Sequence, residues 1–207
     1  MVKVKKILRI VSCVLSLMLV YAYLCFVFIP KDVSDWGGDK YYHAKGFIGE
    51  PDDSLDIIMF GHSGVYSGFS PVTLYKEYGY TSYASSTASQ PIKKINDLLE
   101  KAVKRQKLKV VFLDVDCLYV RFPLIRYYDS LFAPFVFHAR WKNLKPRDFY
   151  LAPGVRTQDV TKGYKFSAEI SGYQPGEYMG KADAKPAAPK KVHLSGLNRF
   201  VKICRKN

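Results

Sequence analysis

The chain has 207 residues, of which 48% are hydrophobic and 24% are charged. This is the balance of an ordinary globular protein, and the length allows one domain with a substantial core while arguing against a second. Aromatic residues make up 15% of the chain, with 16 tyrosines. That content suits either a packed core or a sugar-binding cleft, and we favour the core.

The N-terminal segment has the features of a membrane anchor. Residues 10–30 include no charged residue, and about twenty apolar residues suffice to cross a bilayer as a helix. The basic tip before them should remain in the cytoplasm, so the chain after Pro30 would lie outside it. A cleaved signal peptide is the alternative, but its apolar core would be shorter, and bulky residues 26–29 occupy the place of a small-residue cleavage site. We therefore expect a single-pass cell-membrane protein held by lipid along residues 10–30.

The charge of the chain is strongly basic, with a net value of +14. Four of the 32 Lys and Arg precede the apolar segment and all 18 acidic residues follow it, so the part after the segment carries +10. A basic domain outside the membrane favours anionic lipid headgroups or an anionic or acylated cell-surface polysaccharide as partner. A solvated basic face without a partner is the alternative. The expected topology argues against nucleic acid.

Cysteine and metal-ligand spacing give little guidance. Cys13 and Cys25 fall inside the apolar segment, whereas Cys117 and Cys204 follow it and could form a disulfide, which stays open. No spacing resembles a metal site or a disulfide framework. We expect neither a metal nor a cofactor.

Strand and helix signals alternate from residue 55 onward, after a polar and aromatic connector over 31–54. The predicted elements are a strand over 55–60, a helix from Ser70-Pro71 to Gly79, a strand over 80–83, a helix opened by Ser89-Gln90-Pro91 and running through Val103, and a strand over 108–113. Such alternation with short connections predicts a parallel sheet.

The second half of the chain has a weaker pattern. Residues 117–150 have no clean period, and a Gly-, Pro- and Lys-rich stretch near 151–191 is typical of a flexible insert. A helical face returns at Leu194, Leu197, Phe200, Val201 and Cys204. An amphipathic helix of this kind normally leads into another strand, so we expect the domain at 55–207 to be the N-terminal portion of a doubly wound α/β fold.

Polar residues follow the predicted strands at the edge where open α/β sheets bind ligands. The first strand ends in Gly61-His62-Ser63-Gly64, whose glycines permit a tight turn with backbone N–H groups placed to stabilise an oxyanion. Ser85 follows from the second strand, and Asp114 and Asp116 follow the third. By itself the Gly-x-Ser-Gly turn is equally typical of an ordinary strand-to-helix connection.

Residues 56–94 and 108–116 together resemble the opening of SGNH (GDSL-type) hydrolase-like proteins, in the membrane-anchored branch that moves acyl groups onto bacterial wall polymers. The resemblance rests on spaced elements in order: a strand ending in Gly-x-Ser, a Ser-Pro helix start, a Gln-Pro helix start and a later His138-Ala139-Arg140-Trp141 segment. It covers residues 55 to about 150, with a weaker echo in 192–207. It implies a partial doubly wound sheet of flavodoxin-like order, with Ser63 as the nucleophile and its N–H as an oxyanion donor.

The chain departs from that family at the other catalytic positions. Gly64 stands where the family carries a His after the Ser, and none of the four histidines follows an Asp by three residues. His62 is expected to point away from Ser63, which leaves His138 as the candidate base, with a packed or hydrogen-bonded surface histidine as the alternative. For Arg140 a structural salt bridge is favoured over a site for an anionic group.

The leading functional hypothesis is a serine acyl esterase or acyltransferase that acts on cell-envelope polysaccharide and is incomplete without the residues expected beyond Asn207. The alternative is a non-catalytic envelope protein of the same fold, which binds wall polymer or serves as a scaffold for a synthesis complex.

Overall fold

The protein is described here from a computed structural model that covers residues 2–119, 128–154, 161–164 and 191–207. The chain divides into two compact units. Unit 1 combines residues 1–42 with 123–156, and unit 2 combines residues 43–122 with 157–207. This division cuts the predicted connector at residue 42 and joins a segment from the middle of the chain to the N-terminal helix. The positions of the units relative to one another are not determined, and each is described by itself.

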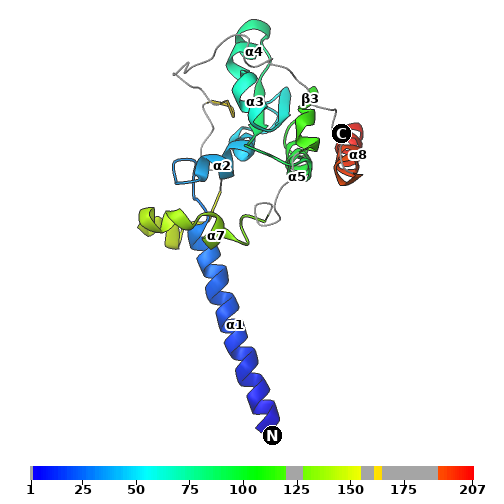
Figure 1. Ribbon diagram of the computed structural model, residues 1–207. Coiled ribbons are helices and arrows are strands. Elements are labelled where there is room, and N and C mark those ends of the chain that lie inside the picture. Colours follow the sequence, from blue (N-terminus) through cyan, green and yellow to red (C-terminus); the bar gives the residue numbers. More distant parts are fainter. Residues whose placement is uncertain (1, 120–127, 155–160, 165–190) are drawn as a thin grey trace, which may run out of the picture. The chain divides into compact units, whose positions relative to one another are not determined.

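The dominant element of unit 1 is the long helix α1 (Val2–Phe28), drawn in blue in Figure 1. Leu, Val and other apolar residues fill it, and neither Gly nor Pro interrupts it before Pro30. An 18-residue stretch within Val4–Phe28 has a mean hydropathy of 2.4 and is mostly exposed. The helix is therefore long and apolar enough to cross a membrane, as the sequence predicts.

Short helices pack around the C-terminal end of α1 (Figure 1). They are α2 (Gly38–Tyr42), α7 (Ala133–Val136) and the 3-10 helices η3 (His138–Asn143) and η4 (Pro146–Phe149). The buried residues that join them to α1 are Cys25, Ile29, Tyr41, Tyr42, Ala133 and Phe137. Unit 1 is thus the apolar helix with a small helical cap on its C-terminal end.

Unit 2 contains a parallel sheet, as predicted. Among the described residues its strands are β1 (Ile57–Gly61), β2 (Ser82–Ser86) and β3 (Val110–Leu113), in the order β2-β1-β3. The second strand starts later than predicted because the Thr81 N–H and hydroxyl are hydrogen-bonded to the Asp56 side chain. The Asp56 carboxylate accepts hydrogen bonds of 3.0 Å from both the N–H and the hydroxyl of Thr81.

The helices of unit 2 begin and end largely where the sequence signals place them. Ser70 caps α4 (Pro71–Tyr78) by accepting the Thr73 N–H at 3.3 Å, and Gly79 ends it in the left-handed conformation at φ 74°. α5 (Ile92–Ala102) starts slightly later than predicted. Ser89 cannot cap it, because its φ of 54° is left-handed rather than the extended conformation of a cap residue.

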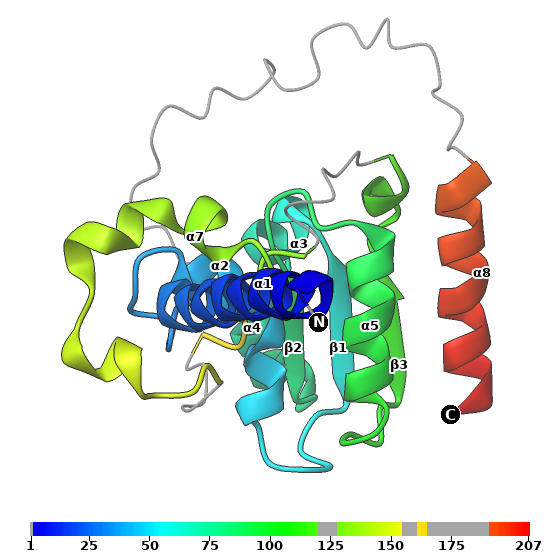
Figure 2. The same ribbon diagram turned by 90° about the horizontal axis from the view of Figure 1, so that it is seen from below.

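The core of unit 2 lies between β1 and α5. Ile58 and Phe60 of β1 meet the predicted apolar face of α5, whose buried members are Ile92, Ile95, Leu98, Leu99 and Ala102. Two further elements add to the core, η1 (His43–Gly49) through Phe47 and α8 (Lys191–Lys206) through Phe200, whose ring centroid lies 6.4 Å from that of Phe60. Figure 2 shows α8 alongside α5. Each fully buried side chain of this size contributes about 1.5–3 kcal/mol.

Candidate functional site

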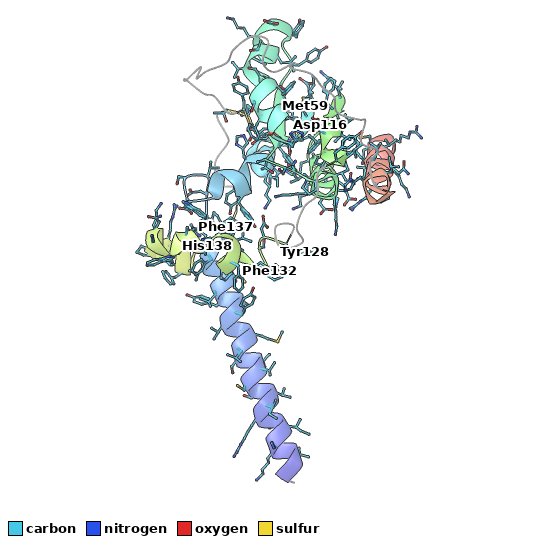
Figure 3. All side chains as sticks on the ribbon, viewed as in Figure 1. Met59, Asp116, Tyr128, Phe132, Phe137 and His138 are labelled. Carbon is cyan, nitrogen blue, oxygen red and sulfur yellow. The ribbon has the colours of Figure 1, made fainter. Side chains whose placement is uncertain are left out.

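The C-terminal ends of β1 and β3 bring a serine, a histidine and two carboxylates together in unit 2. His62 directly follows β1, and Ser63 opens the next helix, α3 (Ser63–Gly68). Asp114 directly follows β3, and Asp116 lies in the 3-10 helix η2 (Val115–Leu118). Figure 3 labels Asp116 near Met59 of β1. The predicted edge of the sheet is therefore the place where these side chains meet.

Gly61 is required for this approach. A Cβ at residue 61 would lie 2.4 Å from Val65 Cγ2 and 2.5 Å from Asp114 Cβ, well inside van der Waals contact. The missing side chain lets α3 and the end of β3 close over the end of β1. Gly64 differs, because a Cβ there would meet no atom closer than 3.8 Å.

The His62 ring turns back toward the start of α3. Its Nδ1 accepts the Gly64 N–H at 3.3 Å, which makes His62 the N-cap of the helix, and the same Nδ1 lies 3.3 Å from Ser63 Oγ. The sequence led us to expect this side chain to point away from Ser63. Capping explains the difference, because an unpaired N–H at a helix start draws a nearby acceptor toward itself.

The other ring nitrogen faces the carboxylates. His62 Nε2 lies 3.6 Å from Asp114 Oδ2 and 3.4 Å from Asp116 Oδ2. Two carboxylates beside Nε2 favour the tautomer with its hydrogen on that nitrogen, which leaves Nδ1 as the acceptor that faces Ser63. Ser63, His62 and an Asp therefore have the relative positions that a nucleophile, its base and an orienting carboxylate would need.

Asp114 is the more firmly held of the two carboxylates. Its Oδ1 accepts the Asp116 N–H at 3.0 Å and its Oδ2 accepts the His62 N–H at 3.4 Å. Its side chain is 16% exposed, against 69% for Asp116. An orienting group must itself be fixed, so Asp114 suits that role better.

The nearby thiol is not a rival nucleophile. Cys117 is fully buried, and burial together with the charges of Asp114 and Asp116 raises its pKa to about 12. A thiol reacts as its thiolate, which such a pKa makes scarce at neutral pH. The sequence leaves open whether Cys117 and Cys204 form a disulfide. In the structure both are free thiols.

The serines of β2 have different surroundings. Ser85 is fully buried, and its hydroxyl donates to the Ala44 carbonyl at 2.6 Å, a bond that joins β2 to η1. Ser86 pairs with Gly61 in the sheet register, and its buried Oγ has no hydrogen-bond partner within the described ranges. Of the two, Ser86 is the one whose hydroxyl remains available to a ligand at this edge.

The same histidine and aspartates also form a group with metal-ligand character. One ring nitrogen of His62 and one oxygen each of Asp114 and Asp116 lie within 4.8 Å of one another. Sequence spacing does not reveal the group, because the members come from two strands 52 residues apart. A divalent cation is therefore a competitor for the carboxylates that face His62.

The His138 segment belongs to unit 1. His138 is exposed, with its Nδ1 3.0 Å from the Phe135 carbonyl oxygen and its ring edge-on to Trp36 at 6.4 Å. Because the placement of unit 1 relative to Ser63 is not determined, the role of His138 as a base stays a prediction. The favoured structural role of Arg140 is confirmed, since it forms ion pairs with Asp35 and Asp148.

Comparisons of the chain with models of known protein families, with curated proteins and with solved structures find no match.

Proposed function

We propose that the protein is a membrane-anchored serine acyl esterase or acyltransferase with an SGNH-like, doubly wound fold, acting on acylated polysaccharide outside the cell membrane. The observation that carries the proposal is the series Ser63, His62, Asp114 at the C-terminal ends of β1 and β3. The resemblance in sequence motifs supports the same nucleophile. The His62 base replaces the histidine that the family supplies near its C-terminus.

In the proposed reaction Ser63 Oγ attacks the carbonyl carbon of an acyl ester and its proton passes to His62 Nδ1. The carbonyl oxygen becomes an oxyanion, which accepts the backbone N–H of Gly64. In the structure the Gly64 N–H donates to His62 Nδ1. If this N–H donates to the oxyanion instead, the Nδ1 lone pair is available only to the Ser63 hydroxyl. The C–O bond to the sugar then breaks, and the departing alcohol takes the proton from His62. Water or a second hydroxyl releases the acyl group from Ser63 in the reverse sequence.

The anchor and the charge support the choice of substrate. α1 would hold unit 2 near the membrane surface, and the chain after residue 30 carries a net charge of +10. Anionic polymers of the cell envelope are attracted to such a domain, and their acyl esters would be the bonds that Ser63 cleaves or forms.

Labelling of membranes with a fluorophosphonate probe tests the proposal, since the probe reacts with activated serines. We expect labelling of the unaltered protein, none of Ser63→Ala and full labelling of Ser67→Ala, which removes an exposed hydroxyl from the same helix. His62→Asn keeps a side-chain acceptor for the helix cap but removes the base, and should lower labelling by about 10²–10⁴-fold.

The outcomes separate the alternatives. Labelling that persists in His62→Asn but fails in His138→Gln would move the base to His138. Labelling that is lost on chelation would assign His62 and the two aspartates to a cation instead. An unaltered protein that is not labelled contradicts the proposal and favours the non-catalytic, polymer-binding hypothesis.

A further inference from the structure

Unit 1 exposes large apolar side chains around the C-terminal half of α1. Residues 131–150, which we call the collar, include five with high exposed fractions: Leu131 62%, Phe135 62%, Trp141 64%, Phe149 47% and Tyr150 74%. Figure 3 labels Phe132, Phe137 and His138 where the collar meets α1. A surface this rich in aromatic and aliphatic groups marks an interaction site rather than a water-facing one.

Hydrogen bonds fix the height of the collar along α1. Tyr21 Oη donates to the Leu131 carbonyl at 2.8 Å, and Tyr23 Oη donates to the Phe149 carbonyl at 3.2 Å. Cys25 Sγ also lies 3.3 Å from the Leu131 carbonyl. Both ends of the collar are therefore attached within α1 rather than above its end.

The rise per residue of α1 gives the depth of each attachment point in the membrane. At 1.5 Å per residue the uncharged run from Ile10 to Ile29 measures roughly 30 Å, the thickness of the hydrocarbon layer. Tyr21 and Cys25 then lie about 12 and 6 Å inside the outer boundary at Ile29. Leu131, which bonds to both, falls at the depth of the outer-leaflet acyl chains and not in the water above them.

Two polar residues of the collar, Arg140 and Lys142, fit such a position. Arg140 Nη1 donates to the carbonyls of Val27, Phe28 and Ile29 at 3.2, 3.0 and 2.7 Å, groups that a helix end otherwise leaves unpaired. Lys142 is exposed and lies 5.5 Å from the Trp141 ring centroid, a pairing suited to the headgroup level. Unsatisfied backbone groups are costly next to lipid, and Arg140 removes three of them.

An apolar groove continues this surface along α1. It has a volume of about 760 Å³ and runs beneath Leu131 and Pro153. Its other lining residues all belong to the uncharged run 10–29: Val14, Leu17, Met18, Tyr21, Ala22, Cys25, Phe26 and Ile29. Because the groove begins on the membrane-spanning face and ends under the collar, its natural occupant is an acyl chain of the outer leaflet.

We infer that the collar is immersed in the interfacial zone of the outer leaflet, where Leu131, Phe135 and Trp141 contact lipid acyl chains and the groove holds one of them. The inference rests on the proposed anchor but not on the esterase chemistry, which fluorophosphonate labelling tests separately. Unit 1 would then be held in the membrane twice, by α1 as the spanning helix and by the collar as an element that lies in the interface.

Tryptophan fluorescence of the full chain in phosphatidylcholine vesicles tests the inference, because the chain has only two tryptophans. Trp36→Phe leaves Trp141 as the reporter, and lipids brominated on the acyl chain quench a tryptophan that touches them. We expect strong quenching of Trp141 by these lipids and weak quenching by aqueous acrylamide. In a Trp36→Phe, Trp141→Phe background, Leu19→Trp on α1 reports insertion and Tyr78→Trp on α4, 68% exposed in the native side chain, reports water.

Each outcome has a definite meaning. Quenching of Trp141 that follows the Leu19→Trp marker supports the collar. If acrylamide quenches Trp141 as strongly as it quenches the Tyr78→Trp reporter, while brominated lipid still quenches the Leu19→Trp reporter, the collar inference is wrong and the anchor stands. If neither quencher reaches Trp141, the chain itself or a second copy covers it and the lipid assignment is wrong. If Leu19→Trp escapes the brominated lipid, both the anchor and the collar fail.

Discussion

Among single residues, Arg140 connects separate segments of unit 1, because it contacts the end of the apolar run, Asp35 and Asp148. Its side chain is 1% exposed and lies between the carboxylates of Asp35 and Asp148, which are 2% and 0% exposed. It also caps α1 through three carbonyls. A buried charge of this kind is tolerated because Nη1 donates to three carbonyls and Nη2 is paired with two carboxylates.

Arg140→Met should destabilise unit 1 by about 3–5 kcal/mol, because it leaves the buried Asp148 carboxylate without its guanidinium and Asp35 with Arg147 and Lys145 as its cationic partners. The free energy of unfolding in detergent is measured by the fluorescence of Trp36 and Trp141, both of which lie in unit 1. Arg199→Met removes an exposed pairing to Asp97 and Glu100 on unit 2 and should cost at most about 1 kcal/mol, measured by far-ultraviolet circular dichroism because unit 2 contains no tryptophan. Equal effects of the two substitutions would contradict the structural role assigned to Arg140.

Asp35 predicts a pH dependence for the same unit. Burial by itself would raise its pKa, but hydrogen bonds from the Lys31 N–H, Arg147 and Lys145 and the charge of Arg140 lower it to about 2. A folded pKa below the unfolded value of about 3.9 means that the carboxylate stabilises the fold above pH 4, and that this stability is lost as pH falls from about 4 to about 2.

The unfolding midpoint of unit 1 should therefore change little from pH 7 to 4.5 and drop steeply below pH 4. Asp35→Asn should lower the midpoint at pH 7 and flatten the acid slope. The slope should not vanish, because the pKa of Asp32 is also lowered: burial raises it, but the Ser34 hydrogen bonds and Arg147 outweigh that effect. An unchanged slope in Asp35→Asn would rule out this origin.

Between elements, α5 and α8 of unit 2 pack closely against each other. A Cβ at Gly196 would lie 2.6 Å from Ile92 Cγ2, and the Gly196 carbonyl accepts the Asn96 side-chain N–H at 2.9 Å. Isoleucine is stiff at χ1, so it cannot turn aside cheaply. The small residue at 196 is what allows α8 to reach the core with Phe200.

Gly196→Ala should destabilise unit 2 by about 1–2 kcal/mol, since overpacking outweighs the gain of nearly 1 kcal/mol in helix propensity. Gly68→Ala is the matched control: it lies in α3 with no atom within 4 Å of the added Cβ, and should be neutral or slightly stabilising. Chemical denaturation followed by far-ultraviolet circular dichroism gives both values. A Gly196→Ala protein as stable as the control would show that α8 does not pack tightly on α5.

At the scale of the whole molecule, the charge asymmetry around α1 predicts an orientation. Basic residues precede the apolar run and the larger unit follows it, so the chain after Pro30 should lie on the outer side. Protease added to intact spheroplasts should then digest unit 2, and α1 should resist extraction with alkaline carbonate. A chain that is digested only after the membrane is opened would have the reverse orientation.

Local signals in the sequence determined the elements. The apolar run made α1, Ser70-Pro71 and Gly79 bounded α4, and the spacing of Ile95, Leu98 and Leu99 defined the buried face of α5. These outcomes follow from a residue and its neighbours within a turn or two, where sterics, capping and burial act directly. The alternation of strands and helices likewise led to the parallel pairing, with shifts of a few residues at the strand starts.

Tertiary structure alone decided which residues meet. The His62 ring faces Ser63 and Asp114 because it caps α3 and because β3 lies next to β1, 52 residues away in sequence. Residues 131–150 join α1 because Arg140 reaches a helix end 111 residues earlier. Sequence periodicity has no information on such contacts, since packing between elements sets them. The candidate nucleophile was therefore readable from the chain, whereas its nearest base and the collar were not.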